Sequence, residues 1–449
     1  MNALLAPYRE AIAGMAAVQR IGHVRRLGGL CVEVQGLNAS VGELCAILPP
    51  GGKQQPGTKP VIAEVVGVRT DGLSLMPYGP VQGLAVGCEV RAHGIQSKLP
   101  VGTALIGRVI DGFGEPLDGK PAPVTDTCRE LRGMPINPML RPRVDTVLET
   151  GVRAIDALLT LGRGQRVGIF AGSGVGKSTL LGMVARHVNA DINVIALIGE
   201  RGREVKEFVD KQLGPQGLAR SVVVVAASDQ PALARLRATY AALAIAEYFR
   251  DRGQHVVLTM DSITRFAMAK REVGLAAGEP PTARGYTPSV FAELPELCER
   301  CGTGPTGGSI TALMTVLVEG DDLNEPIADN MRAILDGHIV LSRQLAQNGQ
   351  YPAIDVLQSA SRVMPDIIAS GERELAAVAL RTAAVLERNR QLVDIGAYTP
   401  GSNPELDLAL SVKTPLLDWL GQRDGVVPRS QACAKLASIL KPVTAARAS

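Results

Sequence analysis

Residues 166–183 read RVGIFAGSGVGKSTLLGM, and this stretch decides the fold of the chain around it. A short apolar run, typical of a buried strand, leads into a glycine-rich turn. The residues after the turn have the apolar spacing of a helix. A strand, a glycine-rich turn and a helix in this order form the context in which a phosphate-binding loop is expected. The stretch therefore predicts an α/β core that binds a nucleotide.

The turn matches the pattern A-x-x-x-x-G-K-S, with Ala171 where the strict motif has glycine. Consecutive backbone N–H groups must point at phosphate oxygens, which needs conformations that glycine adopts most easily. The following helix N-terminus adds a favourable positive potential. We expect Lys177 to reach the β- and γ-phosphates and the Ser178 hydroxyl to bind Mg²⁺. The predicted ATP-binding residues are Ala171, Gly172, Ser173, Gly174, Val175, Gly176, Lys177, Ser178 and Thr179.

Two carboxylates follow further apolar runs, Glu200 after NVIALI and Asp261 after VVLTM. Because open α/β sheets bind ligands at the carboxyl ends of their strands, both side chains are expected near the loop. Asp261 is predicted to hold the Mg²⁺ shell through water, and Glu200 to polarise the attacking water. Glu204 is a further candidate for the metal shell. A helix cap at Asp261 and a solvated turn at Glu200 are the alternatives.

The pattern changes on both sides of this core. Short β-rich stretches separated by Gly and Pro precede it and indicate a small β-barrel. Helical segments follow it and indicate a helical domain. An apolar stripe near the N-terminus fits either a helix docked on its own domain or an arm that binds a partner. The predicted parts are a helical arm (1–20), a β-barrel (21–96), an α/β ATPase domain (97–365) and a helical domain (366–449).

Composition excludes several classes of protein. The 449 residues are 46% hydrophobic and 20% charged, which is typical of a globular chain of several domains. A net charge of +3 and 3% aromatics argue against a nucleic-acid partner. Seven scattered cysteines favour a reducing cytosol, and ordinary helix packing is favoured for the lone CxxC of Cys298 and Cys301. We find no secretory signal and no apolar run of membrane-spanning length.

Together these residues resemble the hexameric ATPases related to the catalytic subunit of rotary ATP synthases. The resemblance is closest to the export ATPases of flagellar and type III secretion systems and covers nearly the whole chain. The stretches that carry it are GRVIDGFGEPLDGKP, RVGIFAGSGVGKSTLLGM, ALIGERGREVKEF, TMDSITRFAMAKREV, GEPPTARGYTPSVFAELPELCERCG and EPIADNMRAILDGHIVLSRQLAQNGQYPAIDVLQSASR.

The resemblance implies a β-barrel, a RecA-like ATPase core and a helical C-terminal domain. It implies that Glu200 is the catalytic carboxylate and that Asp261 ends the Walker B strand. Arg201 and Arg265 match arginines near the γ-phosphate. Arg362, in SASR, matches an arginine finger given to the neighbouring subunit's site. A guanidinium presented across an interface neutralises charge on the transferring phosphoryl group. An internal ion pair is the alternative for Arg362.

The chain departs from the rotary relatives at one position. Those relatives carry an aromatic residue, which stacks on adenine, a dozen or so residues after SASR. Here that stretch reads VMPDIIASGEREL, so the adenine contact is not assigned. Tyr398, in IGAYTP, is the candidate substitute.

The resemblance implies a homohexamer that hydrolyses ATP with Mg²⁺ and promotes protein export, with the flagellar branch favoured. Expected partners are a regulatory stalk-like protein at the arm, the export gate and substrate–chaperone complexes, with no nucleic acid. The expected location is the cytoplasm, peripherally at the inner face of the membrane export apparatus. Alternatives are an injectisome ATPase, a catalytic subunit of a rotary ion-translocating ATPase, an RNA translocase of the Rho kind, and a nucleotide-binding subunit without catalysis.

Overall fold

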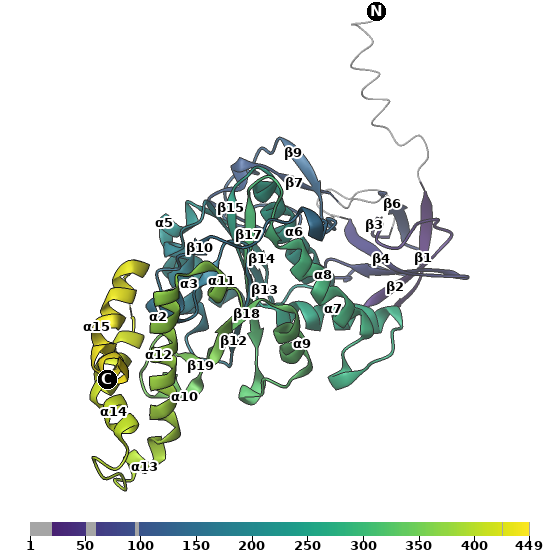
Figure 1. The fold of residues 1–449 in the computed structure, drawn as a ribbon. Coiled ribbons are helices and arrows are strands. Elements are labelled where there is room, and N and C mark those ends of the chain that lie inside the picture. The colour runs from purple at the N-terminus through teal and green to yellow at the C-terminus, as the bar shows by residue number, and fades with distance from the viewer. Residues whose placement is uncertain (1–19, 51–59, 95–97, 424, 449) are drawn as a thin grey trace, which may run out of the picture. The chain divides into compact units, whose positions relative to one another are not determined.

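The computed structural model describes residues 20–50, 60–94, 98–423 and 425–448 (Figure 1). The chain divides into two compact units. One comprises residues 1–97 with 230–234 and 270–280, and the other comprises the remaining residues. Apart from residue 20, the predicted N-terminal arm lies outside the described residues, so both interpretations of it remain predictions. No helix in the described part of the chain is both long and apolar enough to cross a bilayer.

The first unit contains the predicted β-barrel. Its strands close in the order β1-β2-β5-β4-β3-β6, and the barrel is closed where Ile21 of β1 pairs with Arg91 of β6. Alternate side chains point inward, so Val24, Val34 and Val65 are buried in its core. The strands are β1 (Ile21–Gly28), β2 (Cys31–Gln35), β3 (Leu44–Ile47), β4 (Val61–Arg69), β5 (Gly72–Pro77) and β6 (Glu89–Ala92).

The second unit is built on a mostly parallel sheet, as the continuous apolar runs predicted. Its strand order is β19-β18-β12-β17-β15-β13-β14-β8, and β19 at the edge runs antiparallel to β18. In the order of the sheet these strands are β19 (Ile354–Ser361), β18 (Gly337–Leu341), β12 (Arg166–Ala171), β17 (Ser309–Leu317), β15 (His255–Asp261), β13 (Ile192–Ile198), β14 (Ser221–Ala226) and β8 (Arg108–Ile110).

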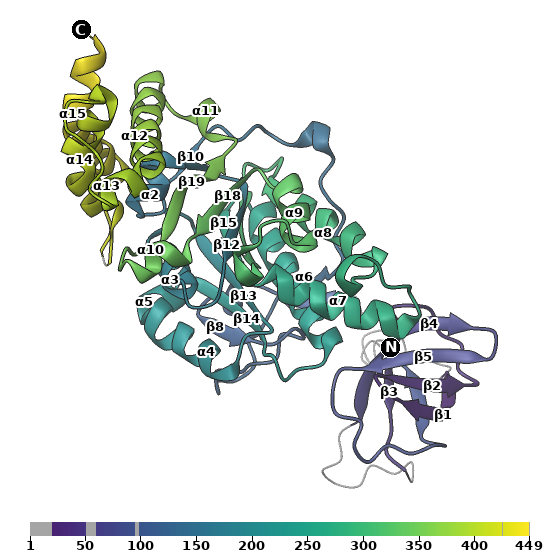
Figure 2. The same ribbon diagram turned by 90° about the horizontal axis from the view of Figure 1, so that it is seen from below.

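Short strand pairs and helices complete this unit (Figure 2). β16 (Gly302–Thr303) pairs with β17, β7 (Lys98–Val101) with β9 (Thr127–Glu130), and β10 (Val147–Leu148) with β11 (Leu161–Gly162). The helices between the strands include α2 (Arg153–Leu158), α3 (Lys177–His187), α4 (Gly202–Glu207), α5 (Gly214–Leu218), α6 (Ala232–Asp251), α7 (Ile263–Ala277), α8 (Pro288–Arg300), α9 (Pro326–Ile334), α10 (Arg343–Gln347) and α11 (Met364–Ile367). Residues 232–234 of α6 and 270–277 of α7 belong to the first unit.

The C-terminal part is helical, as predicted, and packs within the second unit. α12, α14 and α15 contact one another, and α12 also contacts β19. Trp419 anchors this packing: it is 2% exposed, and its indole N–H donates to the backbone oxygen of Ala432 at 3.2 Å. The helices are α12 (Ser370–Arg388), α13 (Arg390–Asp394), α14 (Pro404–Leu420) and α15 (Arg429–Ala448).

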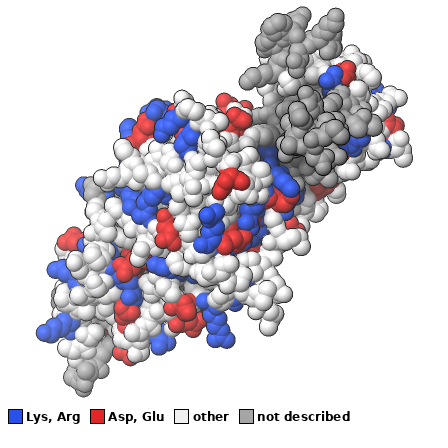
Figure 3. All heavy atoms as spheres, turned by 90° about the horizontal axis from the view of Figure 1, so that it is seen from above, with Lys and Arg blue, Asp and Glu red and all other residues white. Residues whose placement is uncertain are grey.

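Charged side chains of both signs are mixed on one face of the protein (Figure 3). On the face shown in Figure 3, the lysines and arginines of the described residues lie between aspartates and glutamates. This mixture matches the small net charge of +3. Among the described residues of this face, the lysines and arginines form no extended stripe of the kind that follows a nucleic-acid backbone.

Candidate active site

The glycine-rich turn connects β12 to α3. β12 ends at Ala171, and α3 begins at Lys177. Gly174 and Gly176 have φ angles of 78° and 90°, which residues with a Cβ rarely adopt. Gly176 immediately precedes the helix, so the turn presents the first N–H groups of α3 to a ligand. Within the loop Val175 is buried, whereas Ser173, Ser178 and Thr179 are exposed.

Lys177 is the centre of a charged cluster. Its ammonium lies 2.5 Å from a carboxylate oxygen of Asp261 and 3.2 Å from one of Glu200. Asp261 is the last residue of β15, and Glu200 follows β13, so parallel strands bring both to one edge of the sheet. The side chains of Lys177, Glu200 and Asp261 are only 12%, 14% and 4% exposed. The structure thus brings together the three residues that the sequence predicted to act together.

Burial and mutual attraction set the charges of this cluster. Burial raises the pKa of Asp261, against the lowering effects of Lys177 and of a hydrogen bond from Thr315. The Thr315 hydroxyl donates to the same Asp261 oxygen at 2.7 Å. Burial lowers the pKa of Lys177, but the carboxylates of Asp261 and Glu200 together raise this pKa by more than burial lowers it. The net shift is therefore upward. Lys177 is therefore a firmly protonated cation aimed at the space beside the loop.

The side chains at this edge fit a magnesium ion better than a metal held by protein alone. Ser178 offers an exposed hydroxyl at the start of α3, and Asp261 offers a carboxylate. Among the described residues no cluster of three or more His, Cys, Asp or Glu could hold a metal. Mg²⁺ is usually bound by one or two protein oxygens, with water and phosphate completing its shell. This sparse set of ligands therefore suits Mg²⁺.

Glu204, Arg201 and Arg265 occupy different surroundings. Glu204 lies on α4, where its carboxylate pairs with Arg201 at 3.5 Å. Their side chains are 47% and 83% exposed. The side chain of Arg265 packs on Gly199, where a Cβ would lie 2.9 Å from the Cβ of Arg265. Arg265 therefore lies directly beside the backbone that carries Glu200, whereas Glu204 and Arg201 pair with each other at the surface.

Arg362 lies at the other side of the sheet, where the parallel strands begin, whereas the phosphate loop lies where they end. These two sides are called the amino edge and the carboxyl edge. The neighbouring residue Ser361 pairs with Gly337, which is level with Val167 near the start of β12. β12 is six residues long, and the phosphate loop follows its other end, about 16 Å away at about 3.3 Å per residue. Arg362 is exposed, and its guanidinium donates to the backbone oxygen of Arg332 at 3.2 Å. Within the described part of the chain, no carboxylate forms an ion pair with it.

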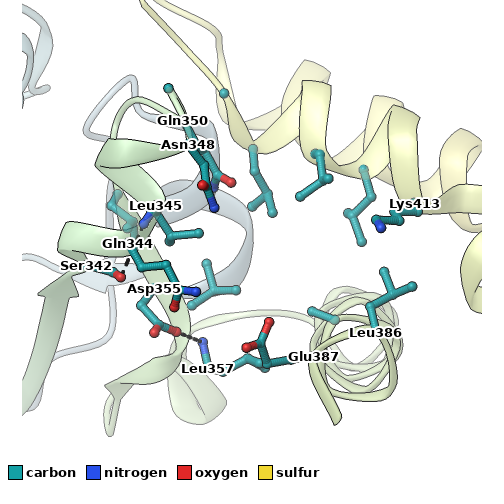
Figure 4. Close-up of a pocket in the computed structure, with 18 of the residues that line it drawn as sticks. Ser342, Gln344, Leu345, Asn348, Gln350, Asp355, Leu357, Leu386, Glu387 and Lys413 are labelled. Carbon is teal, nitrogen blue, oxygen red and sulfur yellow. Dashed lines mark hydrogen bonds between the residues drawn. The ribbon is translucent and has the colours of Figure 1, made fainter. Parts of the chain in front are cut away.

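A tyrosine that the sequence analysis missed lies beside the loop. A Cβ built on Gly176 would be 3.3 Å from Cδ1 of Tyr351, so this ring packs against the turn. Tyr351 also borders a cavity of about 830 Å³ between α10, β19 and the helices α12 and α14 (Figure 4). Tyr398 instead donates its hydroxyl to Asp407 at 2.8 Å and packs among C-terminal helices. Tyr351, rather than Tyr398, is thus the aromatic side chain at the phosphate loop.

Tyr351 could have been found from the sequence by a different rule. It lies in GQYPAID, directly before the strand that ends in SASR, and not after SASR, where an aromatic was sought. A parallel strand beside β12 and an antiparallel return along β19 bring residues before that return strand back to the phosphate loop. The signal is therefore the topology around the residue rather than its distance from the arginine.

The lone CxxC pair is part of the core. Cys298 and Cys301 are 1% and 0% exposed, and burial raises the pKa of the Cys301 thiol to about 12. A thiol with so high a pKa is a poor nucleophile and a poor metal ligand at neutral pH. These two side chains thus pack as small hydrophobic groups, which is the interpretation that the sequence favoured.

Comparison with known proteins places this geometry in a family. A model of the β-barrel domain of the ATP synthase alpha/beta family matches residues 25–94 of this chain. A model of the nucleotide-binding domain of the same family matches residues 151–361. A model of the T3SS EscN ATPase C-terminal domain matches residues 368–438. The chain is 54% identical to the flagellum-specific ATP synthase of Bacillus subtilis, with 90% of this chain and 91% of that protein covered.

Similarity extends to type 3 secretion proteins and to solved structures. The chain is 50% identical to the type 3 secretion system ATPase of Xanthomonas euvesicatoria, with 92% of each chain covered. It matches the structure of the assembled ATPase EscN of enteropathogenic E. coli with a TM-score of 0.87 and 43% identity. That match covers 93% of this chain and all of the EscN chain. The chain therefore belongs to the family of flagellum-specific ATP synthases and type 3 secretion ATPases.

Proposed function

We propose that this chain hydrolyses ATP at sites completed by a neighbouring copy of itself, and that the hydrolysis serves flagellar-type protein export. One observation carries the proposal. Lys177 contacts Glu200 and Asp261 at one edge of the sheet, whereas Arg362 projects from the other edge. A chain with this arrangement holds most of one site and contributes an arginine to another.

Within its own subunit, the phosphate loop binds the β- and γ-phosphates through the backbone and Lys177. The ammonium of Lys177 exchanges a carboxylate contact for phosphate oxygens. This exchange leaves Glu200, held 3.2 Å from Lys177, to accept a hydrogen bond from the attacking water. Arg265, which packs on Gly199 next to Glu200, is proposed to meet the γ-phosphate. Tyr351 offers a ring to the adenine on the loop's outer side.

Magnesium is proposed as the metal cofactor. Ser178 and Asp261 would hold it, Asp261 through water, and Thr315 fixes the carboxylate of Asp261 by a hydrogen bond at 2.7 Å. A bound Mg²⁺ supplies neutralisation of charge on the phosphate oxygens. Glu204 is proposed to support the water shell of the metal, and Arg201 is proposed to lie near the γ-phosphate. Their side chains form an exposed ion pair at the start of α4.

The neighbouring site needs Arg362. A guanidinium neutralises charge that develops on the transferring phosphoryl group, and here it does so across a subunit interface. Such an interface is heterologous, and rings form when its rotation closes. EscN has been solved as an assembled ATPase and also in complex with its central stalk EscO. We infer a homohexamer for this chain, built from the four parts that the sequence predicted at residues 1–20, 21–96, 97–365 and 366–449.

Further partners follow from the same proposal. A regulatory stalk-like protein is proposed at the N-terminal arm, and the export gate and substrate–chaperone complexes are proposed as later contacts. The working place is the cytoplasm, peripherally at the membrane export apparatus. Both flagellar and type 3 secretion relatives are about half identical to this chain, and the flagellar assignment is favoured by the 54% and 53% matches to flagellum-specific proteins.

The test is the rate of ATP hydrolysis per protomer as a function of protein concentration. We expect the rate to rise steeply with concentration, because an isolated protomer lacks Arg362 at its own site. Glu200→Gln should lower the rate about 100-fold to 10,000-fold, the range for general acid–base groups. Glu207→Gln, on α4 with a half-exposed carboxylate that pairs with Arg203, is the matched control and should keep the rate.

Two results would contradict the proposal. A rate that is independent of concentration and survives Glu200→Gln removes both the catalytic carboxylate and the shared site. Hydrolysis that appears only after addition of a different protein of similar fold points instead to a rotary ATPase subunit.

A further inference from the structure

Gln165 is a fully buried amide at the far end of the sheet from the phosphate loop. It directly precedes β12 and is 0% exposed. Its side-chain oxygen accepts from the N–H of Gly162 at 2.9 Å. Its side-chain nitrogen donates to the backbone oxygen of Asp336 and to the hydroxyl of Ser361, both at 3.1 Å. Both amide hydrogens and the oxygen of this buried group are thus used.

The two groups that accept from Gln165 hold the backbone of Arg362. Ser361 is the preceding residue, and its hydroxyl donates onward to the backbone oxygen of Thr160 at 2.9 Å. The Asp336 oxygen also accepts from the N–H of Arg362 at 2.9 Å. One amide therefore fixes the residue before Arg362 and the partner of Arg362 at the same time.

Asp336 is itself held rigidly by Arg166, the first residue of β12. One oxygen of its carboxylate accepts from Nε of Arg166 at 2.9 Å, and the other accepts from Nη2 at 3.0 Å. A bidentate contact of this kind adds geometric precision to charge attraction. Arg166 also donates its backbone N–H to the same carboxylate at 3.0 Å. Asp336 thus cannot shift without moving the start of β12.

Gly337 packs closely against the Gln165 amide and against β19. A Cβ on Gly337 would lie 2.7 Å from the backbone oxygen of Ala360 and 3.1 Å from the Gln165 nitrogen. Only glycine lets β18 approach β19 this closely. The packing sets the spacing of the two strands at the point where Arg362 leaves β19.

We propose that Gln165 is the positioning residue for Arg362 and holds it in the orientation in which it meets the neighbouring subunit's nucleotide. The proposal rests on the shared site of the proposed function. A long, exposed arginine side chain loses less conformational freedom on reaching its target when its backbone is fixed. A misplacement of about 1 Å at a catalytic group can cost about 100-fold in rate. Gln165 acts through Arg362 and touches no substrate.

The first measurement is the steady-state kinetics of Gln165→Met, which keeps the side-chain volume and removes the hydrogen bonds. We expect kcat to fall at least tenfold with little change in the KM for ATP, because Arg362 acts on the transition state of the neighbour's site. Asn193→Leu is the matched control. Asn193, near the start of β13, is another buried amide in this unit, and it donates to the backbone oxygen of Ala185 on α3 at 2.8 Å. It should keep kcat.

The decisive measurement uses mixed rings made by co-expression of two differently tagged chains. Lys177→Ala removes the subunit's own site but keeps its Arg362, whereas Gln165→Met keeps its own site but misplaces Arg362. Each variant alone should be nearly inactive. Mixed rings should regain about a quarter of the wild-type rate per protomer, the chance that a complete pair is adjacent in a random heterologous ring. Arg362→Ala mixed with Lys177→Ala is the reference pair.

Each outcome decides the proposal. Rescue in both mixtures supports it. Rescue of Arg362→Ala but not of Gln165→Met by Lys177→Ala overturns the role of Gln165, because the defect of Gln165→Met then lies in the subunit's own site. The shared site is still supported in that case. No rescue with Arg362→Ala contradicts the shared site and, with it, the role of Gln165. If Gln165→Met fails to fold, Ser361→Ala removes one of the same contacts and is scored in the same way.

Discussion

The cations at the two edges of the sheet differ in their partners. At the carboxyl edge, the ammonium of Lys177 meets the carboxylates of Asp261 and Glu200 within 2.5 and 3.2 Å. At the amino edge, Arg362 is exposed, and its described partner is the backbone oxygen of Arg332. The first edge is electrostatically satisfied within one chain, whereas the second presents a cation without a carboxylate. The difference indicates that the charges at the first edge are paired within the chain, whereas the cation at the second edge is available to a carboxylate or phosphate of another molecule.

The largest expected effect comes from removing the arginine at the amino edge. Arg362→Ala should lower kcat about 1,000-fold or more, because arginine fingers contribute about 10³ to 10⁵ in rate. Nucleotide affinity should be kept, since the phosphate loop of the same subunit is untouched. The measurement combines ATP hydrolysis with a fluorescent-nucleotide titration. Arg373→Ala, an exposed arginine of α12, is the control and should behave as wild type. Equal losses in the two variants would remove the special role of Arg362.

A smaller effect is expected from removing the hydrogen bond to Asp261 at the carboxyl edge. Thr315→Val keeps the shape of the side chain and removes the hydrogen bond to Asp261. We expect the Mg²⁺ concentration for half-maximal hydrolysis to rise about tenfold to 100-fold, the range seen when a partner of a metal ligand is lost. Thr311→Val is the control, because Thr311 is equally buried on β17 and accepts instead from the N–H of Gly164. An unchanged Mg²⁺ dependence in Thr315→Val would separate Asp261 from the metal.

Much of this site could be predicted from the sequence, because it depends on short-range patterns. Glu200 and Asp261 each follow an apolar strand, and parallel strands bring such residues to a common edge. Tyr351 and Gln165 could not be predicted in this way. Tyr351 reaches Gly176 through the return of β19, and Gln165 bonds Asp336 and Ser361 across 171 and 196 residues. The barrel and the C-terminal helices were predicted from turn residues and apolar spacing, which are also local signals.

A third experiment tests the outer side of the carboxyl edge. Tyr351→Ala should raise the KM for ATP about tenfold, since stacking of a base on an aromatic ring is worth about 1–3 kcal/mol. The kcat should change little, because a base-stacking contact is made equally in the ground state and in the transition state. Tyr398→Ala is the matched control and should keep the KM, as its hydroxyl is bonded to Asp407. A larger effect of Tyr398→Ala than of Tyr351→Ala would reverse this assignment.

The smallest expected effect is on the pH dependence of stability, and it concerns two buried aspartates in different surroundings. Asp261 faces an ammonium, whereas Asp156 of α2, 0% exposed, accepts from the neutral groups of Thr150 and Gly151. Burial raises the pKa of Asp156 to about 6, although these hydrogen bonds lower it. Because the folded pKa is raised, the stability that the protonated carboxyl contributes is present below about pH 4. It is lost as the pH rises through about 6.

The variant Asp156→Asn cannot ionise and should lack this loss, which is at most about 3 kcal/mol at 1.36 kcal/mol per pKa unit. Thermal unfolding followed between pH 4.5 and 7.5 provides the measurement. We expect the melting temperature of the variant, relative to wild type, to rise by a few degrees as the pH increases. A difference that stays constant with pH would show that Asp156 does not titrate in this range.

If Arg362 completes a neighbour's site as proposed, its placement opposite the phosphate loop sets the number of active sites in an assembly. In an open arc of subunits, the Arg362 of the subunit at one end would then reach no site, and the site of the subunit at the other end would receive no arginine. An arc of n subunits thus has n − 1 working sites, and only closure into a ring adds the last. Closure should therefore appear as a gain in catalysis without any new protein, so that anything that opens or seals the ring also sets the fraction of bound ATP that is hydrolysed.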